Sequence, residues 1–115
     1  MRSILIVIAL ILSSASFGQE RKPTAILGYG NVPCDEWSDA RSQTNAASIM
    51  SVYSMMGWVD GYVTAALIGS DVGARKFPSM GVDAVVTWLD AYCGAHASDS
   101  LALAAATFAD ALAAK

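Results

Sequence analysis

CDEW at residues 34–37 and WLDAYC at residues 88–93 are the two segments that decide the fold, because they hold the chain's two cysteines. Both cysteines lie among aromatic residues, downstream of a segment with the layout of an export signal. Cysteines that reach an oxidising compartment tend to pair. We therefore predict one structural disulfide, Cys34–Cys93, which should stabilise this small domain by about 4 kcal/mol. The flanking Trp37, Trp88 and Tyr92 are expected to be structural core aromatics.

The first 18 residues have the features of a cleaved signal peptide. Arg2 provides a positive charge, residues 4–12 are uninterruptedly apolar, and small residues follow up to Gly18. The alternative is an N-terminal membrane anchor, but the apolar run is shorter than the roughly 20 residues that a bilayer requires. We predict cleavage after Gly18, with Ala15 as the alternative position, and an exported protein without a stable membrane span after signal removal.

The remaining chain is sized for one domain and carries little charge. The whole sequence has a net charge of −3, and charged residues make up 15% of it. Its basic residues are not clustered on one stretch, as binding to a polyanion would require. Nucleic acid is therefore not an expected partner.

The pattern of apolar residues and turn-formers predicts an all-α fold of four helices. Residues 19–33 read as an extended lead-in, and residues 34–42 as a short helix with acidic residues in its first turn. Apolar residues spaced by three and four predict a long helix over 45–68 and further helices over 82–93 and 101–112. Gly94 is the expected stop of the third helix, and Ser98 or Asp99 the cap of the fourth. The predicted organisation is a signal peptide (1–18), the lead-in (19–33) and a disulfide-tied helical domain (34–115).

Two glycines lie inside the predicted long helix. Gly57 and Gly61 are four residues apart and so share one helix face, and each costs about 1 kcal/mol relative to alanine. We interpret them as packing positions that allow close approach of another helix or of the Trp37 ring. A ligand groove is the alternative interpretation.

The sequence offers no constellation for catalysis or metal binding. His96 is the single histidine, so a His-based zinc triad is impossible, and a mixed Cys/His site would have to break the disulfide. Its place between two predicted helices favours a surface or capping residue. A lone histidine near two serines lacks the oriented third group of a catalytic triad. We expect no enzyme activity, no cofactor and no bound metal.

Aromatic residues of the long helix are the candidate partner-binding set. Trp58 and Tyr62 lie outside the main apolar stripe and are expected to expose a patch suited to a protein partner, as is Tyr53. A place in the core is the alternative. The segment 69–81 reads as a loop long enough to take part in binding, and it carries Asp71, Arg75 and Lys76.

The order of these motifs resembles that of small exported helical proteins. The chain has a Gly-x-Gly lead-in at 28–30, CDEW at 34–37, GWVDG at 57–61 and WLDAYC at 88–93, followed by Asp99 and Leu101. Over residues 28–112 it resembles the group around HdeA-type periplasmic acid chaperones and Tai-type immunity proteins of type VI secretion. This resemblance implies a disulfide-tied helical domain in a bacterial periplasm that works by binding proteins.

Two functions follow from the resemblance. The first is an immunity or inhibitor protein that occludes an effector; the alternative is an acid-stress chaperone that shields unfolded clients. Tai-type proteins often carry another cysteine where this chain has Met55, and HdeA-type chaperones are much richer in charge. Because the sequence combines an aromatic face and a long loop with no active site, we expect an immunity-type protein that occludes its partner through Trp58, Tyr62 and the segment 69–81. A homodimer or a purely structural envelope role is also open.

Overall fold

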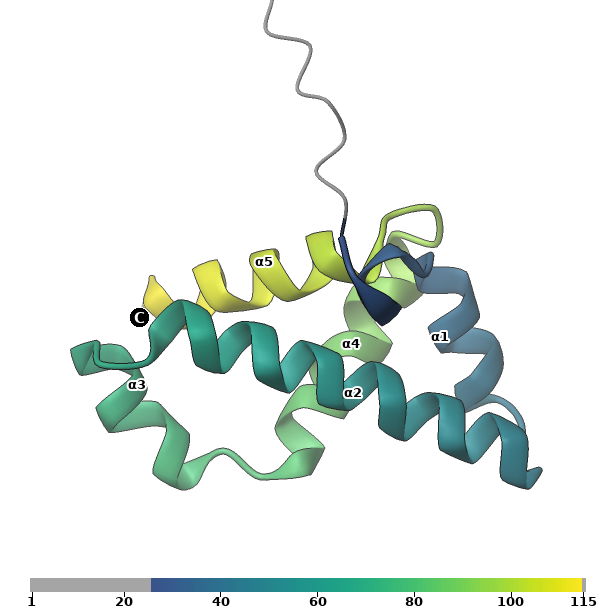
Figure 1. Ribbon diagram of the computed structural model, residues 1–115, viewed down its shortest axis with the longest axis horizontal. Coiled ribbons are helices and arrows are strands. Elements are labelled where there is room, and N and C mark those ends of the chain that lie inside the picture. Colours follow the sequence, from purple (N-terminus) through teal and green to yellow (C-terminus); the bar gives the residue numbers. More distant parts are fainter. Residues whose placement is uncertain (1–25, 115) are drawn as a thin grey trace, which may run out of the picture.

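Residues 26–114, which a computed structural model of the protein describes, are mostly helical and contain five α-helices where four were predicted (Figure 1). The predicted signal peptide and residues 19–25 of the predicted lead-in lie outside this range. Residues 28–31, predicted to be extended, form a short 3-10 helix. The elements are η1 (Gly28–Asn31), α1 (Cys34–Arg41), α2 (Ala46–Leu67), α3 (Asp71–Lys76), η2 (Phe77–Ser79), α4 (Val82–Ala95) and α5 (Leu101–Ala113).

Helix α2 is the central element of the described part, and the other four α-helices and η1 pack against it. Asn45 caps its start, because the Asn45 side chain accepts a hydrogen bond from the Ser48 backbone N–H at 2.9 Å. Its 22 residues span about 33 Å. Helix α5 lies along its C-terminal half and α1 beside its N-terminal half (Figure 1). Its buried side chains recur at helical spacing: Met55, Met56, Val59, Val63 and Leu67.

A disulfide and a buried polar contact join α1 to α4. The predicted Cys34–Cys93 pair is confirmed, with both cysteines buried and their Cα atoms 4.8 Å apart. One helical turn further along, Trp37 is fully buried and its indole N–H donates to Asp90 Oδ1 at 2.9 Å. Arg41 donates to both oxygens of the same carboxylate, each at 2.9 Å. Asp90 thus links two turns of α1 to α4.

The loop before α5 holds the start of α1 through backbone hydrogen bonds. The Cys34 N–H donates to the Asp99 carbonyl at 2.7 Å, and the Leu101 N–H donates to the Val32 carbonyl at 2.8 Å. Each bond satisfies a backbone N–H at the start of a helix that has no partner within its own helix, Cys34 in α1 and Leu101 in α5. The disulfide and the loop therefore both fix the start of α1.

The helix ends on either side of this loop differ from those predicted. Ser100, rather than Ser98 or Asp99, caps α5, because its hydroxyl accepts the Leu103 N–H at 3.1 Å. Helix α4 continues through Gly94 and ends at Ala95. His96 is its C-cap residue and is exposed, as the sequence indicated.

The segment predicted as a loop over 69–81 contains α3 and η2, which accounts for the fifth helix. Ser70 caps α3 by accepting the Gly73 N–H at 3.1 Å. Asp71 lies in its first turn and Arg75 and Lys76 in its last, the arrangement that complements the helix dipole. The prediction was wrong because the glycine, serine and proline content of this segment was weighted above its capping pattern.

The aromatic residues near Cys93 form a stacked group beside the core. Trp88 lies between Tyr92 and Phe108, with ring centroids 4.9 and 4.8 Å away. The Tyr92 hydroxyl donates to Asp99 Oδ2 at 2.8 Å. This stack joins α4 to α5 on the side of the disulfide.

Reduction of the disulfide should lower the free energy of unfolding by about 4 kcal/mol, because it releases a cross-link between residues 59 apart in sequence. Urea unfolding with and without reductant measures this difference. The Cys34→Ser/Cys93→Ser variant should lose the same amount and be insensitive to reductant. A loss below about 1 kcal/mol would contradict the expectation.

Two substitutions at Asp90 should distinguish its hydrogen bond with the buried Trp37 indole from its exposed ion pair with Arg41. Asp90→Ala leaves the buried Trp37 indole N–H without an acceptor, which costs about 1–3 kcal/mol. Asp90→Asn keeps an acceptor and loses the ion pair with Arg41, whose solvent-exposed geometry limits its contribution to about 1 kcal/mol or less. Chemical denaturation of both variants gives the comparison. Equal losses would show that the indole contact contributes nothing.

The same variants should differ from the parent in acid. The hydrogen bonds from Arg41, with a further one from Trp37, lower the pKa of Asp90 in the folded protein. A lowered folded pKa adds stability that is present above the unfolded pKa, near 3.9, and is lost as pH falls through the folded value. In the Asp90→Asn variant this contribution is absent, so the free energy of unfolding should fall less steeply as the pH is lowered through this range. Urea unfolding of both proteins over a series of acidic pH values measures the difference.

Candidate functional site

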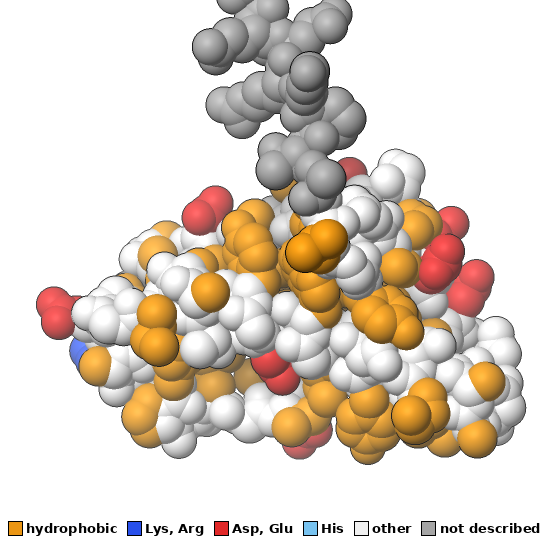
Figure 2. Space-filling model, viewed as in Figure 1, with side chains coloured by type: hydrophobic (Ala, Val, Ile, Leu, Met, Phe, Trp, Pro, Cys, Tyr) orange, Lys and Arg blue, Asp and Glu red, His pale blue; other side chains and the backbone are white. Residues whose placement is uncertain are grey.

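Helix α2 has an uncharged face that the rest of the described chain leaves exposed. We call it the outer face: Met50, Tyr53, Gly57 and Gly61, which follow one another at helical spacing opposite the buried residues, and the C-cap residue Ile68 just beyond the helix end. Met50, Tyr53 and Ile68 are 66%, 62% and 72% exposed. Between Ala46 and Leu67 the only charged residue is Asp60. Figure 2 shows hydrophobic and uncharged side chains along most of α2.

The predicted packing role of the two glycines is wrong. A Cβ atom added at Gly57 or at Gly61 would meet nothing within 4 Å in the described chain, so neither another helix nor the Trp37 ring approaches them. The glycine that does allow close packing is Gly73 of α3, where an added Cβ would lie 2.4 Å from the Leu67 carbonyl oxygen. Gly57 and Gly61 instead leave a shallow strip of bare backbone along the outer face.

Trp58 has a structural contact that the sequence did not indicate. Its indole N–H donates to the Leu27 carbonyl at 2.9 Å, and its ring lies so close to Gly30 that an added Cβ there would be 2.3 Å away. Tyr62 stacks on the Trp58 ring at a centroid distance of 5.7 Å and stays partly exposed. Trp58 is therefore half-buried under η1, and Tyr62 is the more accessible of the pair.

The remaining predicted binding residues lie at other places on the surface. Tyr53 is on the outer face and also lines a shallow hollow with Arg41 and Ile49. Asp71 and Arg75 are exposed on α3, and Lys76 is half-buried at its end. The structure thus brings Trp58 and Tyr62 together but separates them from Tyr53 and from the charged residues of α3.

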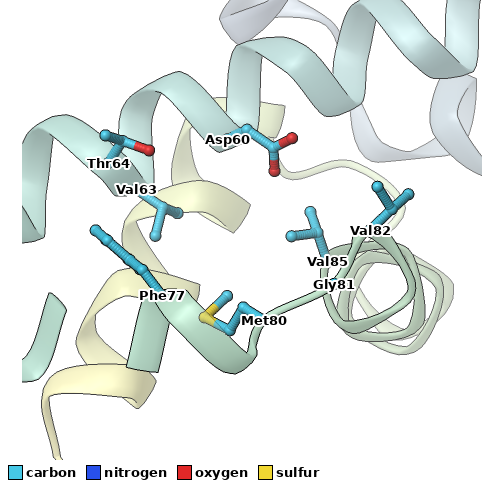
Figure 3. Close-up of a pocket in the computed structure, with 8 residues that line it drawn as sticks. All are labelled: Asp60, Val63, Thr64, Phe77, Met80, Gly81, Val82 and Val85. Carbon is cyan, nitrogen blue, oxygen red and sulfur yellow. The ribbon is translucent and has the colours of Figure 1, made fainter. Parts of the chain in front are cut away.

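A cleft that sequence analysis missed lies between α2, η2 with its following residues, and the start of α4 (Figure 3). Its volume is about 320 Å³. Helix α2 contributes Asp60, and the Asp60 side chain points toward the space in front of Val85. The other lining residues are mainly apolar: Val63, Thr64, Phe77, Met80, Gly81, Val82 and Val85.

Asp60 is the one titratable residue lining this cleft, and it has no partner within residues 26–114. The single ion pair of that range is Arg41–Asp90. Burial raises the pKa of Asp60, and no hydrogen bond or charge from the described part of the chain acts on this carboxyl. A lone carboxylate in an otherwise uncharged helix of 22 residues is the sequence signal that could have located the cleft.

His96 has a local role at the end of α4. Its ring stacks on Tyr92 at 4.2 Å, and its Nδ1 lies 2.9 Å from the Tyr92 carbonyl oxygen. Among the described residues, no group of three or more His, Cys, Asp or Glu side chains is arranged to hold a metal ion. Within the same range, no helix combines the length and apolar character required to cross a bilayer.

Comparison of the chain with protein-family models, with curated proteins and with solved structures gave no significant match.

Replacing the outer-face glycines should stabilise the isolated protein. Gly57→Ala and Gly61→Ala each remove a helix-interior glycine and introduce a methyl group into open space, so each should raise the free energy of unfolding by up to about 1 kcal/mol. Gly73→Ala is the matched control and should cost about 1–3 kcal/mol, because its methyl group collides with the Leu67 carbonyl. Thermal and urea unfolding test whether the free energy of unfolding rises in the first two variants and falls in the control. A loss of stability at Gly57 or Gly61 would mean that the outer face is packed in the free protein.

Proposed function

We propose that the protein is a periplasmic protein-binding module of the immunity or inhibitor type, which occludes a partner protein with the outer face of α2. The resemblance to exported helical proteins supplies the class of function. The disulfide is compatible with an oxidising compartment. The exposed, uncharged outer face is the observation that carries the proposal.

The composition of α2 supports a covering partner. A surface helix normally has a polar or charged side opposite its buried stripe, and a helix without one is normally enclosed. Helix α2 buries Val59 and its neighbours on one side, yet it exposes Met50 and Tyr53 on the other. Tyrosine and methionine are enriched in protein interfaces, where they become desolvated. A folded partner would complete the enclosure of this helix.

The glycine pair supports the same proposal on energetic grounds. Two glycines inside a helix lower its stability by about 2 kcal/mol in total relative to alanine, and no contact within the described chain requires them. Such a cost is typical of surfaces that serve a function rather than the fold. A partner backbone or a flat side chain could approach the bare strip at Gly57 and Gly61 more closely than any other part of the helix surface.

Site-specific photocrosslinking in intact cells tests this proposal. A photoreactive phenylalanine analogue in place of Tyr53 should give one dominant adduct with a folded partner, whereas the same analogue in place of Leu103, an exposed apolar residue of α5, should not. The product of the adjacent reading frame is the first protein to examine. The purified chain should then inhibit the captured protein at equimolar ratio.

Matched substitutions separate binding from folding. Gly57→Gln adds a long side chain to the outer face and should weaken the complex by at least about tenfold without lowering the stability of the free chain. Leu103→Gln introduces the same side chain on α5 and should leave affinity unchanged. Adducts of equal strength from both positions would contradict the proposal. Adducts with many unfolded proteins, formed only in acid, would instead support the acid-stress chaperone.

A further inference from the structure

We propose that the cleft around Asp60 accepts a basic side chain of the partner protein, a lysine or an arginine whose apolar stem lies against the cleft wall while its cationic group meets the Asp60 carboxylate. This inference rests on the proposed function, because it assumes that the partner is a protein. Its evidence is separate, since it comes from the cleft and not from the outer face.

The walls of the cleft match the stem of such a side chain. Val63, Val85 and Phe77 present apolar surface from three different elements. Met80 adds a flexible, polarisable side chain that adapts to an entering group. Lysine and arginine bury their methylene groups along apolar surface while the charged end stays with a polar partner. The volume of about 320 Å³ leaves room for one extended side chain.

The charge of the cleft selects for a cation. The Asp60 carboxylate points into an apolar space, and no basic group of residues 26–114 forms an ion pair with it. The Thr64 hydroxyl, at the opposite wall from η2, is the other side-chain oxygen among the lining residues and offers a second acceptor. A carboxylate would be repelled, and a neutral alcohol would leave the charge of Asp60 uncompensated.

Desolvation supports the same assignment. Burial raises the pKa of Asp60, so the folded protein holds this proton more tightly than the unfolded chain and loses stability as pH rises through the unfolded and then the folded pKa. Asp60→Asn should therefore stabilise the free chain at neutral pH. A bound cation acts in the opposite direction and should lower the pKa of Asp60.

Small amphipathic probes test the cleft without knowledge of the partner. Hexylammonium and butylguanidinium should bind the oxidised, full-length mature protein with dissociation constants of about 1 mM, and NMR shifts should centre on the lining residues. Hexanol and hexanoate, with the same apolar stem, should bind at least about tenfold more weakly. The carboxyl carbon of Asp60 should titrate at lower pH with hexylammonium present. Equal binding of hexanol would overturn the inference.

Substitutions at Asp60 distinguish charge from shape. Asp60→Asn keeps the size of the side chain and should reduce hexylammonium affinity about tenfold, whereas Asp60→Glu should keep it within about threefold. In the complex with the captured partner, Asp60→Asn should weaken binding and hexylammonium should compete. If the Asp60→Asn variant binds both the probe and the partner as tightly as the parent protein does, the inference about the cleft is wrong, even where the crosslink from the outer face supports the proposed function. Probe binding without any captured partner would overturn the proposed function and support the cation site alone.

Discussion

The joint between α1 and α4 is the constraint on which the rest of the structure depends. Helix α1 has eight residues, too few to persist alone in water, where isolated helices shorter than about 12–15 residues are marginal. The disulfide holds its first residue, and Asp90 holds it one and two turns further along through Trp37 and Arg41. With α1 fixed to α4, the two helices together form a surface on which α2 packs. The position of α2, and so of both candidate binding surfaces, depends on this packing.

One side of helix α2 contributes to the core, whereas the other side has features that lower the stability of a helix. Its buried residues supply the centre of the core. Its exposed side has two glycines and, at the rim, the Asp60 carboxylate, for which residues 26–114 provide neither a packing partner nor a counter-ion. Both features lower the stability of the isolated chain, and both are of the kind that a bound partner would compensate. Local departures of this sort are expected at functional surfaces, because stability there is balanced against binding.

The sequence was sufficient to predict the disulfide and the main helices, since these depend on residue spacing. Apolar residues at intervals of three and four located α2, α4 and α5, and the acidic first turn located α1. Spacing does not reveal which atoms come close in space. Gly73 was therefore read as a loop residue although it packs against the Leu67 carbonyl, and Gly57 was read as a packing residue although it faces open space. The cleft was missed for the same reason, because its walls come from three separate segments.

The two candidate surfaces share an edge, which argues for one partner rather than two. Gly61 follows Asp60 directly in the sequence, and Thr64 lies one helical turn from both, so the bare glycine strip and the cleft adjoin along α2. A segment laid along the strip would pass beside the opening of the cleft, within reach of a long basic side chain. Covering the strip would also exclude water from the Asp60 carboxylate and so strengthen its attraction to a cation. The outer face would then supply most of the affinity. The Asp60 charge would fix the position of the partner along α2 and exclude partners that have no basic residue opposite the cleft.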